Sequence, residues 1–455
     1  MILFNLVSSG LFCQDNVWSL ERCITYALEN NIMIKQQAIN AVFQENTYRQ
    51  SKFDAFPNLN ANASHNYSFG RALDESTYRF TENENVQSNS FYTQANVTLF
   101  NGFQTLNTIK QNKLNMLASQ KEVEKVRNDI SLNIALAYLQ ILFNQELVTV
   151  AENQLEVTNQ QVERTRILVN AGSIPHGNLL EIMAQQANEE LQLVNYQNQL
   201  EISYLTLTQM LELDSVGDFR IEVPVITIPP GDELAYTVNG IYNHAELIMP
   251  QIQSAEYQLK ASEAGLLVAK GMRSPNLSLN SYISTRYSDI RTRTMLDENG
   301  NPVIGPDLMP VQETYPFWDQ LNDNINYGLG ISLSIPIFNG LRTNTAVSNA
   351  KLNLDNSKLS LQNARNQLYK EIQQKYADAR AALKRYNASQ KTVTSMEESF
   401  RYVEQKLNVG AVTSVEYNTS KNMLMKAQSD FLQAKYEYIF QINVLEFYMG
   451  NPIKL

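Results

Sequence analysis

Few residues in this chain have the types and spacing that chemistry at a site requires. Its two cysteines, Cys13 and Cys23, lie near the start, and its three histidines, His65, His176 and His244, are far apart. Metal sites usually draw their ligands from short repeated spacings, so the sequence predicts neither a metal site nor another cofactor. No nucleophile elbow and no phosphate-binding loop occurs. We therefore expect no catalytic residue and interpret the protein as a non-enzyme.

The overall composition disfavours two further classes of protein. Lys and Arg number 36 and Asp and Glu 46, a net charge of −10, and no basic cluster occurs, so nucleic-acid binding is not expected. Charged residues make up 18% of the chain against a typical value of about 25%, which argues against an acidic disordered protein. No stretch of about 18 apolar residues is evident, so the sequence predicts no transmembrane helix.

Residues 1–14 have the pattern of a targeting segment. The apolar run from Ile2 to Val7 is followed by small residues, as in a signal peptide. The usual basic residues are missing, since the first Lys or Arg is Arg22; a start codon placed too late or a buried N-terminal strand would each explain this. We interpret residues 1–14 as a truncated signal peptide cleaved near Cys13. Phe12 argues against lipidation of that cysteine.

The placement of proline and glycine predicts two very long helices. The runs 103–171 and 341–409 contain neither residue. Each run is long enough for one helix of about 68 residues, or about 100 Å. Apolar residues recur every three or four positions along 130–169 and again along 424–445, as in coiled coils, although several of these positions are small or polar. These runs alone favour an ordinary long coiled coil.

Four other segments alternate apolar and polar residues and are predicted strands: about 57–70, 90–101, 275–288 and 324–338. A tilted strand crosses a bilayer in about 9–11 residues. Asn and Ser occupy the polar face, which suits a water-filled lumen, and aromatic residues near the strand ends suit the interfacial girdles of membrane barrels. Soluble hairpins packed on a helix are the alternative.

The chain contains an internal duplication. FNGF at 100–103 recurs as FNGL at 338–341, and VNAG at 169–172 recurs as LNVG at 407–410, both with the same offset along the chain. FPNL at 56–59 recurs as SPNL at 274–277 with a shorter offset, and the difference falls in the second strand-to-strand loop, which is the longer one. We predict two structural repeats, 15–227 and 228–455, each with the order helix, strand, strand, long helix, helix.

This order of elements, with the FNGF and FNGL junctions and the turns RILVNAGSIPHGNLLE and KLNVGAVTSVEYNTS, resembles the TolC-like outer membrane efflux protein family over roughly residues 16–452. The resemblance implies a mainly α fold with a small β part. It also implies a trimer, with a 12-stranded outer membrane β-barrel continuing into a long periplasmic α-helical barrel. The implied function is a conduit for efflux or type I secretion in the outer membrane of a Gram-negative bacterium. Its implied partners are a periplasmic adaptor protein and an inner-membrane pump of the RND, ABC or MFS type.

Elementary barrel geometry agrees with an oligomer. Four strands do not close a barrel, and lipid does not tolerate an open sheet edge. Several copies must therefore combine their strands if these strands enter the outer membrane lipid. The residues alone allow two, three or four copies.

The two turns between long helices, about 169–178 and 407–416, are the predicted site. The family resemblance assigns adaptor contact to the residues around each turn glycine: Asn170, Ala171, Gly172, Ser173, Val409, Gly410 and Ala411. A local explanation is equally good, because glycine suits the tight reversal of a helical hairpin. Pro175 and Gly177 occur only in the first turn and are expected to loosen the helix that follows it.

A second set of predicted residues lies just beyond each turn. Family members often carry carboxylates here that line the closed periplasmic entrance. The corresponding residues are Asn178 and Glu181 after the first turn and Glu416 and Thr419 after the second. The local alternative is a solvated helix start, where acidic side chains interact favourably with the helix dipole.

The sequence can be compared with three classes of function. The conduit accounts for both the helices and the four alternating segments. A periplasmic or surface coiled-coil structural protein would explain the helices but would leave the predicted strands without a role. An enzyme would need a compact domain that encloses a site, and the sequence indicates none. The cargo cannot be inferred from these residues.

Overall fold

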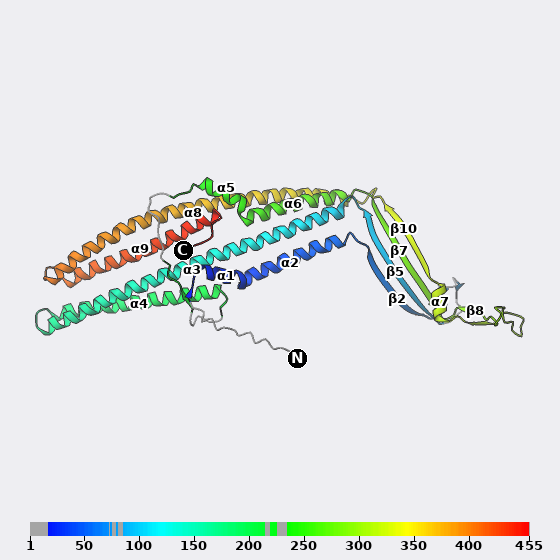
Figure 1. Ribbon diagram of the computed structural model, residues 1–455, viewed down its shortest axis with the longest axis horizontal. Coiled ribbons are helices and arrows are strands. Elements are labelled where there is room, and N and C mark those ends of the chain that lie inside the picture. Colours follow the sequence, from blue (N-terminus) through cyan, green and yellow to red (C-terminus); the bar gives the residue numbers. More distant parts are fainter. Residues whose placement is uncertain are drawn as a thin grey trace, which may run out of the picture. The chain divides into compact units, whose positions relative to one another are not determined.

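The computed structural model describes residues 17–71, 73–74, 79–80, 85–213, 219–224 and 234–454 (Figure 1). The predicted signal peptide, including Cys13, lies outside these residues. The helices are α1 Leu20–Asn30, α2 Ile32–Phe53, α3 Gln104–Asn170, α4 His176–Met210, α5 Val238–Ile248, α6 Pro250–Gly271, α7 Phe317–Asp323, α8 Arg342–Asn408 and α9 Ser414–Tyr448. The strands are β1 Val17–Trp18, β2 Asn58–Ser68, β3 Leu73–Asp74, β4 Arg79–Phe80, β5 Val86–Phe100, β6 Arg220–Ile221, β7 Asn276–Ser288, β8 Thr292–Thr294, β9 Gln312–Thr314 and β10 Asn326–Ser334.

The main elements of the two repeats match residue for residue in length. Helices α3 and α8 each have 67 residues, and α4 and α9 each have 35. Helix α3 begins at Gln104 and α8 at Arg342, while α4 begins at His176 and α9 at Ser414, so one constant offset relates both pairs of helices. The predicted tandem order of helix, strand, strand, long helix and helix is confirmed.

Two compact units are present, and they do not coincide with the two repeats. Unit 1 consists of residues 1–42, 117–257 and 359–455, and unit 2 of residues 43–116 and 258–358. Each unit takes material from both repeats, because α3 and α8 run from one unit into the other.

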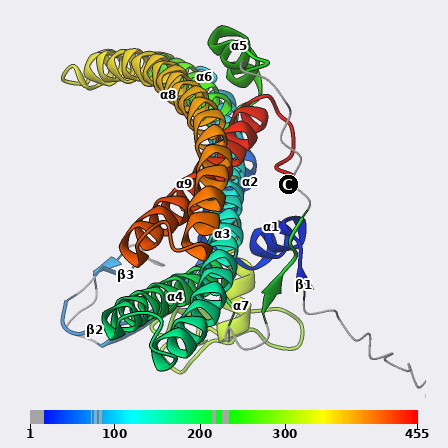
Figure 2. The same cartoon turned by 90° about the vertical axis from the view of Figure 1, so that its left-hand side faces the viewer.

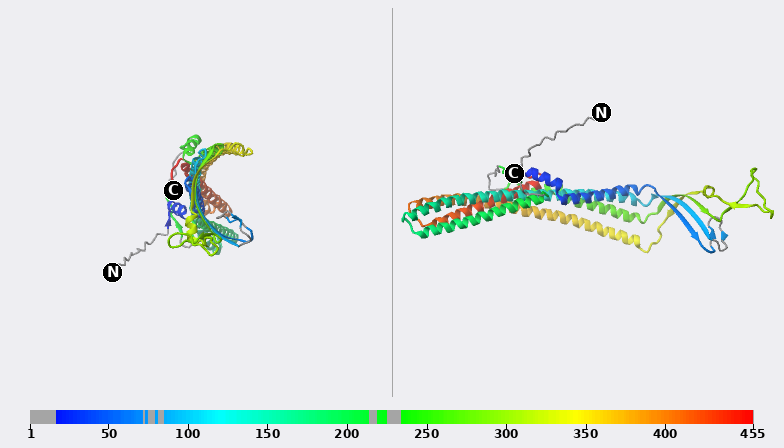
Figure 3. Two further views of the ribbon diagram at one scale, coloured as in Figure 1. Left: turned by 90° about the vertical axis from the view of Figure 1, so that its right-hand side faces the viewer. Right: turned by 90° about the horizontal axis from the view of Figure 1, so that it is seen from below.

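Unit 2 contains a four-stranded antiparallel sheet with the order β10-β7-β5-β2. The strands lie side by side and the sheet is curved (Figures 1 and 3). Except at Phe100, after a register shift at the end of β5, odd-numbered residues pair with odd-numbered ones, for example Leu333 with Leu277 and Val97 with Leu279. The alternating sequence pattern therefore gives one largely apolar face and one polar face. On the polar face, the Asn280 amide donates to the Ser332 hydroxyl at 3.0 Å.

The strand bounds differ slightly from the sequence pattern. Strand β5 begins at Val86, earlier than the alternation suggested, while β10 ends at Ser334, before Pro336. Proline has no backbone N–H to donate to a sheet, so ladder pairing stops near it. The long second loop also contains the short hairpin β8–β9 and helix α7, which carries Phe317 and Trp318.

Two junctions lead from a strand into a long helix, and both use left-handed backbone. Gly102 and Phe103 have φ of 65° and 62°, and Gly340 and Leu341 have φ of 62° and 63°. A Cβ on Gly102 would lie 2.6 Å from the Gly271 carbonyl oxygen, whereas a Cβ on Gly340 would meet nothing within 4 Å. Packing as well as backbone conformation therefore requires the first glycine, and backbone conformation alone favours the second.

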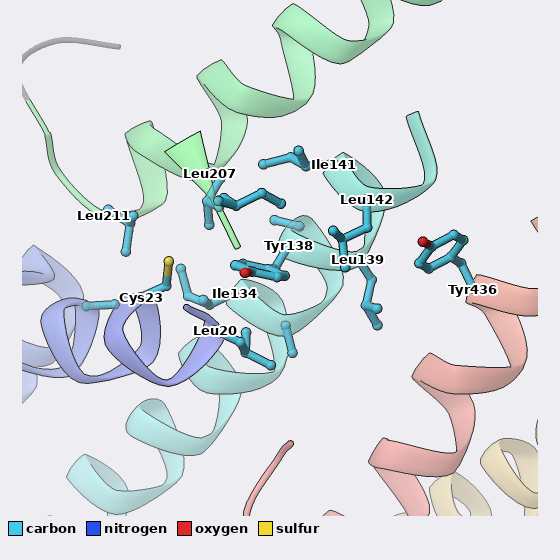
Figure 4. Packing of buried hydrophobic residues seen from close by; sticks show 14 of the residues in the cluster. Leu20, Cys23, Ile134, Tyr138, Leu139, Ile141, Leu142, Leu207, Leu211 and Tyr436 are labelled. Atoms are coloured by element: carbon cyan, nitrogen blue, oxygen red, sulfur yellow. The ribbon is translucent and has the colours of Figure 1, made fainter. Parts of the chain in front are cut away.

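The core of unit 1 packs α1, α3, α4 and α9 around Tyr138 (Figure 4). The Tyr138 hydroxyl donates to the Glu222 carbonyl at 2.6 Å, so this buried polar group is satisfied. Cys23 is fully buried in the same cluster, and burial raises the pKa of its thiol to about 12, an effect that Arg22 partly offsets. Cys23 is thus a structural residue of the core.

No stretch of the chain was expected from its sequence to be apolar enough to span a membrane, and one helix departs from this expectation. Helix α3 contains an 18-residue window that is apolar enough, by length and composition, to cross a membrane. In the structure 61% of that window is buried inside the protein, as expected of a core helix. The apolar composition is explained by the unit 1 core that this helix crosses.

Candidate functional site

The helical hairpins α3–α4 and α8–α9 each end in a turn (Figure 2), and the two turns have the same backbone hydrogen bonds. In the first turn, the Ser173 amide donates to the Leu168 carbonyl and the Gly172 amide to the Val169 carbonyl, each at 2.9 Å. In the second, the Ala411 amide donates to Lys406 at 2.9 Å and the Gly410 amide to Leu407 at 3.0 Å. This pair of bonds defines the Schellman motif, which satisfies the last carbonyls of a helix.

Both turn glycines have positive φ, +69° at Gly172 and +72° at Gly410. A Cβ added at either position would meet no atom within 4 Å. Backbone conformation alone therefore accounts for each glycine within a single chain. The residues predicted to contact an adaptor are exposed: Asn170, Ala171, Gly172, Ser173, Val409, Gly410 and Ala411.

The two descending helices start differently. Helix α9 begins after Thr413, whose hydroxyl accepts from the Glu416 amide at 3.2 Å as a side-chain N-cap. Helix α4 begins after Pro175, which has no side chain that caps the helix. Pro175 and Gly177 were expected to loosen α4, but α4 has the same length as α9. Proline suits the extended backbone of an N-cap, so Pro175 does not shorten the helix.

The four residues predicted to line the entrance all lie within the first two turns of α4 and α9. Glu181, Glu416 and Thr419 are exposed, and Asn178 is half-buried. The Thr419 hydroxyl donates to the Val415 carbonyl at 2.8 Å, so it is satisfied within its own helix. Glu416 also has a local role, since it is the acidic residue of the first turn of α9.

A buried ionic cluster, which the sequence reasoning missed, joins the two hairpins. We call it the ion-paired cluster; it consists of the buried residues Thr158, Gln185, Glu189 and Lys421 and the exposed Asn422. The Lys421 ammonium lies 3.1 Å from a Glu189 carboxylate oxygen, and their side chains are only 1% and 3% exposed. Lys421 also donates to the Gln154 carbonyl at 3.1 Å and to the Thr158 hydroxyl.

Every charged atom of this cluster has partners. The Glu189 carboxylate accepts from Gln185 at 2.7 Å and from the fully buried Thr158 hydroxyl. Gln185 in turn donates to Asn422 at 2.9 Å. Burial lowers the pKa of Lys421, and the neighbouring Glu189 carboxylate partly offsets this effect. The cluster therefore ties α9 to both α3 and α4 through saturated polar contacts.

The sequence did contain a signal for this cluster. Leu179, Ile182, Gln185 and Glu189 follow one another at the spacing of an apolar helix stripe, and Glu189 takes a place where an apolar residue is expected. Lys421 likewise stands three residues before Leu424 in the stripe of α9. A charged residue at such a position indicates a buried partner, although the pattern does not say which one.

The three histidines lie on separate elements of the described chain. His65 lies on β2, His176 begins α4 and His244 lies on α5. Across the part of the chain that the structure describes, no three His, Cys, Asp or Glu side chains are grouped to hold a metal ion.

Comparison with known proteins identifies the family. The model of the outer membrane efflux protein family matches residues 23–212 and 241–451. This chain belongs to that family. Outer membrane protein TolC of Escherichia coli K12 is 20% identical over 456 residues, which cover 97% of this chain and 84% of TolC. Outer membrane efflux protein BepC of Brucella suis is 18% identical over 425 residues, 92% of this chain and 83% of BepC.

A solved structure supports the same fold. The outer membrane protein VceC of Vibrio cholerae has a TM-score of 0.76 at 16% identity, with 96% of this chain and 97% of VceC covered. The predicted family and fold are confirmed. As an outer membrane efflux protein, the chain is a channel component of the outer membrane with its helical part in the periplasm. The reading as a coiled-coil structural protein is thereby set aside.

Proposed function

We propose that three copies of this chain form a closed efflux conduit whose periplasmic end binds an adaptor protein. The observation that carries the proposal is the open four-stranded sheet of an outer membrane protein. Strands β2 and β10 are the two edges of this sheet, and each has a single neighbour in it. Unpaired strand edges are not tolerated in lipid, so β2 of one copy pairs with β10 of the next. Three copies bring the sheet to 12 strands.

The two faces of the sheet fit this assembly. The apolar face of β10 carries Leu329, Ile331 and Leu333, which are 75%, 68% and 61% exposed in the single chain. Exposed apolar rows of this kind are expected where strands meet lipid. The opposite face, with Asn280 and Ser332 hydrogen-bonded to each other, suits a water-filled lumen.

We further propose that the two turns contact the adaptor. The seven residues assigned to this contact are exposed, and Val409 is an apolar side chain with 79% of its surface accessible. An exposed apolar side chain beside open glycine backbone gives a helical partner a close approach. The inner-membrane pump, of the RND, ABC or MFS type, then passes cargo to the conduit through this adaptor.

The carboxylates beyond the turns are proposed to line the entrance. Three copies of Glu181 and Glu416, with Asn178 and Thr419, would surround the axis. A ring of carboxylates favours cations at a constriction. The double variant Glu181→Ala, Glu416→Ala removes both charges. In planar-bilayer recordings, its preference for cations should be weaker, and polyvalent cations should inhibit its conductance less. Unchanged selectivity and block would mean that both residues lie on an outer helix face.

Docking is tested with Gly410→Trp. We expect this variant to lose efflux while its detergent-extracted trimer and membrane insertion stay near normal, because the turn is separated from the strands by a helix of 67 residues, or about 100 Å. The control is Gly300→Trp, at another open glycine with positive φ, +82°, in the second strand-to-strand loop. Loss of the trimer in Gly410→Trp alone would assign that glycine to folding and would remove the docking proposal.

A further inference from the structure

The internal duplication gives each residue of the ion-paired cluster a counterpart in the other repeat. Counterparts share one constant offset, which relates His176, the start of α4, to Ser414, the start of α9. The counterparts of Thr158, Gln185, Glu189, Lys421 and Asn422 are respectively Met396, Met423, Ala427, Met183 and Ala184. All five polar residues are therefore replaced by apolar ones. We call these five counterparts the methionine face.

The methionine face lacks a complete contact within one chain. Met183 is 42% and Met423 55% exposed and Met396 is half-buried, whereas the polar counterparts of these three residues are buried. Only Ala427 is already buried, at 6% exposure. Within the chain, Lys421 of the second repeat inserts between Thr158 and Glu189 of the first repeat. The equivalent contact for the methionine face needs the first repeat of another copy beside the second repeat of this one.

Helix geometry allows α9 to make both contacts together. Asn422 reaches Gln185 of α4 in the same chain, at 2.9 Å. Met423 is the next residue and therefore points about 100° away around the helix. Helix α9 can thus lie between α4 of its own chain and α4 of a neighbouring copy. If α9 of every copy lies against α4 of the next copy in this way, the copies form a closed ring.

We propose that the methionine face is the contact between neighbouring copies, with Met183 of one copy inserted against Met396 and Ala427 of the next, and that this contact separates when the periplasmic end opens. The proposal rests on the trimeric conduit proposed above. Separation of the ion-paired cluster would leave a charged group without its partner in a largely buried setting. Separation of the methionine face strands no charge, and flexible thioether side chains repack readily.

Disulfide cross-linking tests the contact. The pair Ala184→Cys with Met423→Cys, in a Cys13→Ser background, should give species of two and three chain masses on oxidation. The control pair, Gln185→Cys with Asn422→Cys, occupies the equivalent contact inside the chain and should cross-link without any increase in mass. Cys23 is fully buried and stays in place. If the first pair forms trimers but gives no cross-link between chains, the proposed contact is wrong and the proposed trimeric conduit is unaffected. If no oligomer forms at all, both proposals are wrong.

Opening is tested on the same proteins in planar bilayers. Oxidation of the Ala184→Cys, Met423→Cys channel should abolish stimulated conductance, and a reductant should restore it. Oxidation of the Gln185→Cys, Asn422→Cys channel should leave conductance unchanged, because that contact stays closed during opening. The opposite pattern would assign movement to the contact within the chain and would contradict the proposal.

A charge graft provides a test that does not depend on disulfide geometry. Met183→Lys or Met396→Glu alone should lower trimer yield, since each would place a charge in an apolar contact between copies. The double variant should recover trimer yield, because the two charges would pair across the contact as Lys421 and Glu189 do within the chain. No recovery in the double variant would show that these positions do not meet.

Discussion

The α3–α4 hairpin and the α8–α9 hairpin share their lengths, 67 and 35 residues, and end in turns with the same hydrogen bonds, yet their chemistry differs. The first hairpin buries Glu189 and Thr158 against Lys421 of the second. The second presents Met396 and Ala427 at the corresponding places. The two hairpins therefore share backbone lengths and turns, while the residues of the contact within the chain are polar and their counterparts are apolar. Equal backbones do not imply equal interfaces.

The largest effect is expected from breaking the ion-paired cluster on one side. Lys421→Met should lower the stability of the helical part by about 3–5 kcal/mol, because it leaves the Glu189 carboxylate buried without its countercharge. The triple variant Thr158→Met, Glu189→Ala, Lys421→Met copies three of the five residues of the methionine face, and it should lie within about 1 kcal/mol of the parent, since apolar replacement of a whole buried pair is often neutral. Thermal unfolding followed by circular dichroism in detergent measures both.

If the triple variant is as unstable as Lys421→Met, the comparison between the two contacts fails. The polar residues would then be needed for more than their mutual pairing.

The sheet provides a contrast, because here the repeats are expected to behave alike. Leu333 on β10 and its counterpart Ala95 on β5 lie on the same apolar face, which the register of the sheet connects. Ala95→Arg and Leu333→Arg should both destabilise the inserted barrel, by about 2–4 kcal/mol for a side chain near the bilayer midplane and by less for Leu333, because Leu333 lies one residue from the end of β10 and the cost of a charge falls toward the interface. Ser332→Arg should be tolerated. Refolding into lipid vesicles measures all three, and assembly of Leu333→Arg together with failure of Ser332→Arg would reverse the two faces.

The two turn glycines should respond equally. Gly172→Ala and Gly410→Ala each place a Cβ on left-handed backbone, at a cost of about 1–2 kcal/mol, and neither creates a steric contact. Gly177 is the control, since it lies inside α4 without positive φ, and Gly177→Ala should stabilise the helix by about 0.5–1 kcal/mol. Hydrogen exchange at the turns distinguishes these outcomes. A much larger effect at one turn glycine would reveal a contact that the single chain does not show.

The smallest expected difference concerns the helix starts. Thr413→Ala removes the N-cap of α9 and should cost about 1 kcal/mol, seen as faster amide exchange in the first turn. Pro175→Ala removes no side-chain cap from α4 and should have a smaller effect on the helix. Equal effects at the two positions would mean that the cap does not distinguish the hairpins.

The sequence by itself determined the duplication, the two long helices, the strands and the turns. These features depend on local signals: helix breakers such as Gly172 and Gly410, a period of two in the strands, and spacings of three and four in the helices. The same signals located the exposed turn residues. They did not fix the last residues of β10, because the ladder ends where its partner and Pro336 allow.

Only the tertiary structure decided which buried polar groups meet. Lys421 and Glu189 are separated by 232 residues, and both stand at positions where a local pattern predicts an apolar side chain. Their pairing depends on the relative position of α4 and α9, which no local spacing encodes. The strand order β10-β7-β5-β2 is likewise a product of long-range pairing. The physical reason is that periodicity reports which face of an element is buried, whereas the partner of that face is set by packing among distant segments.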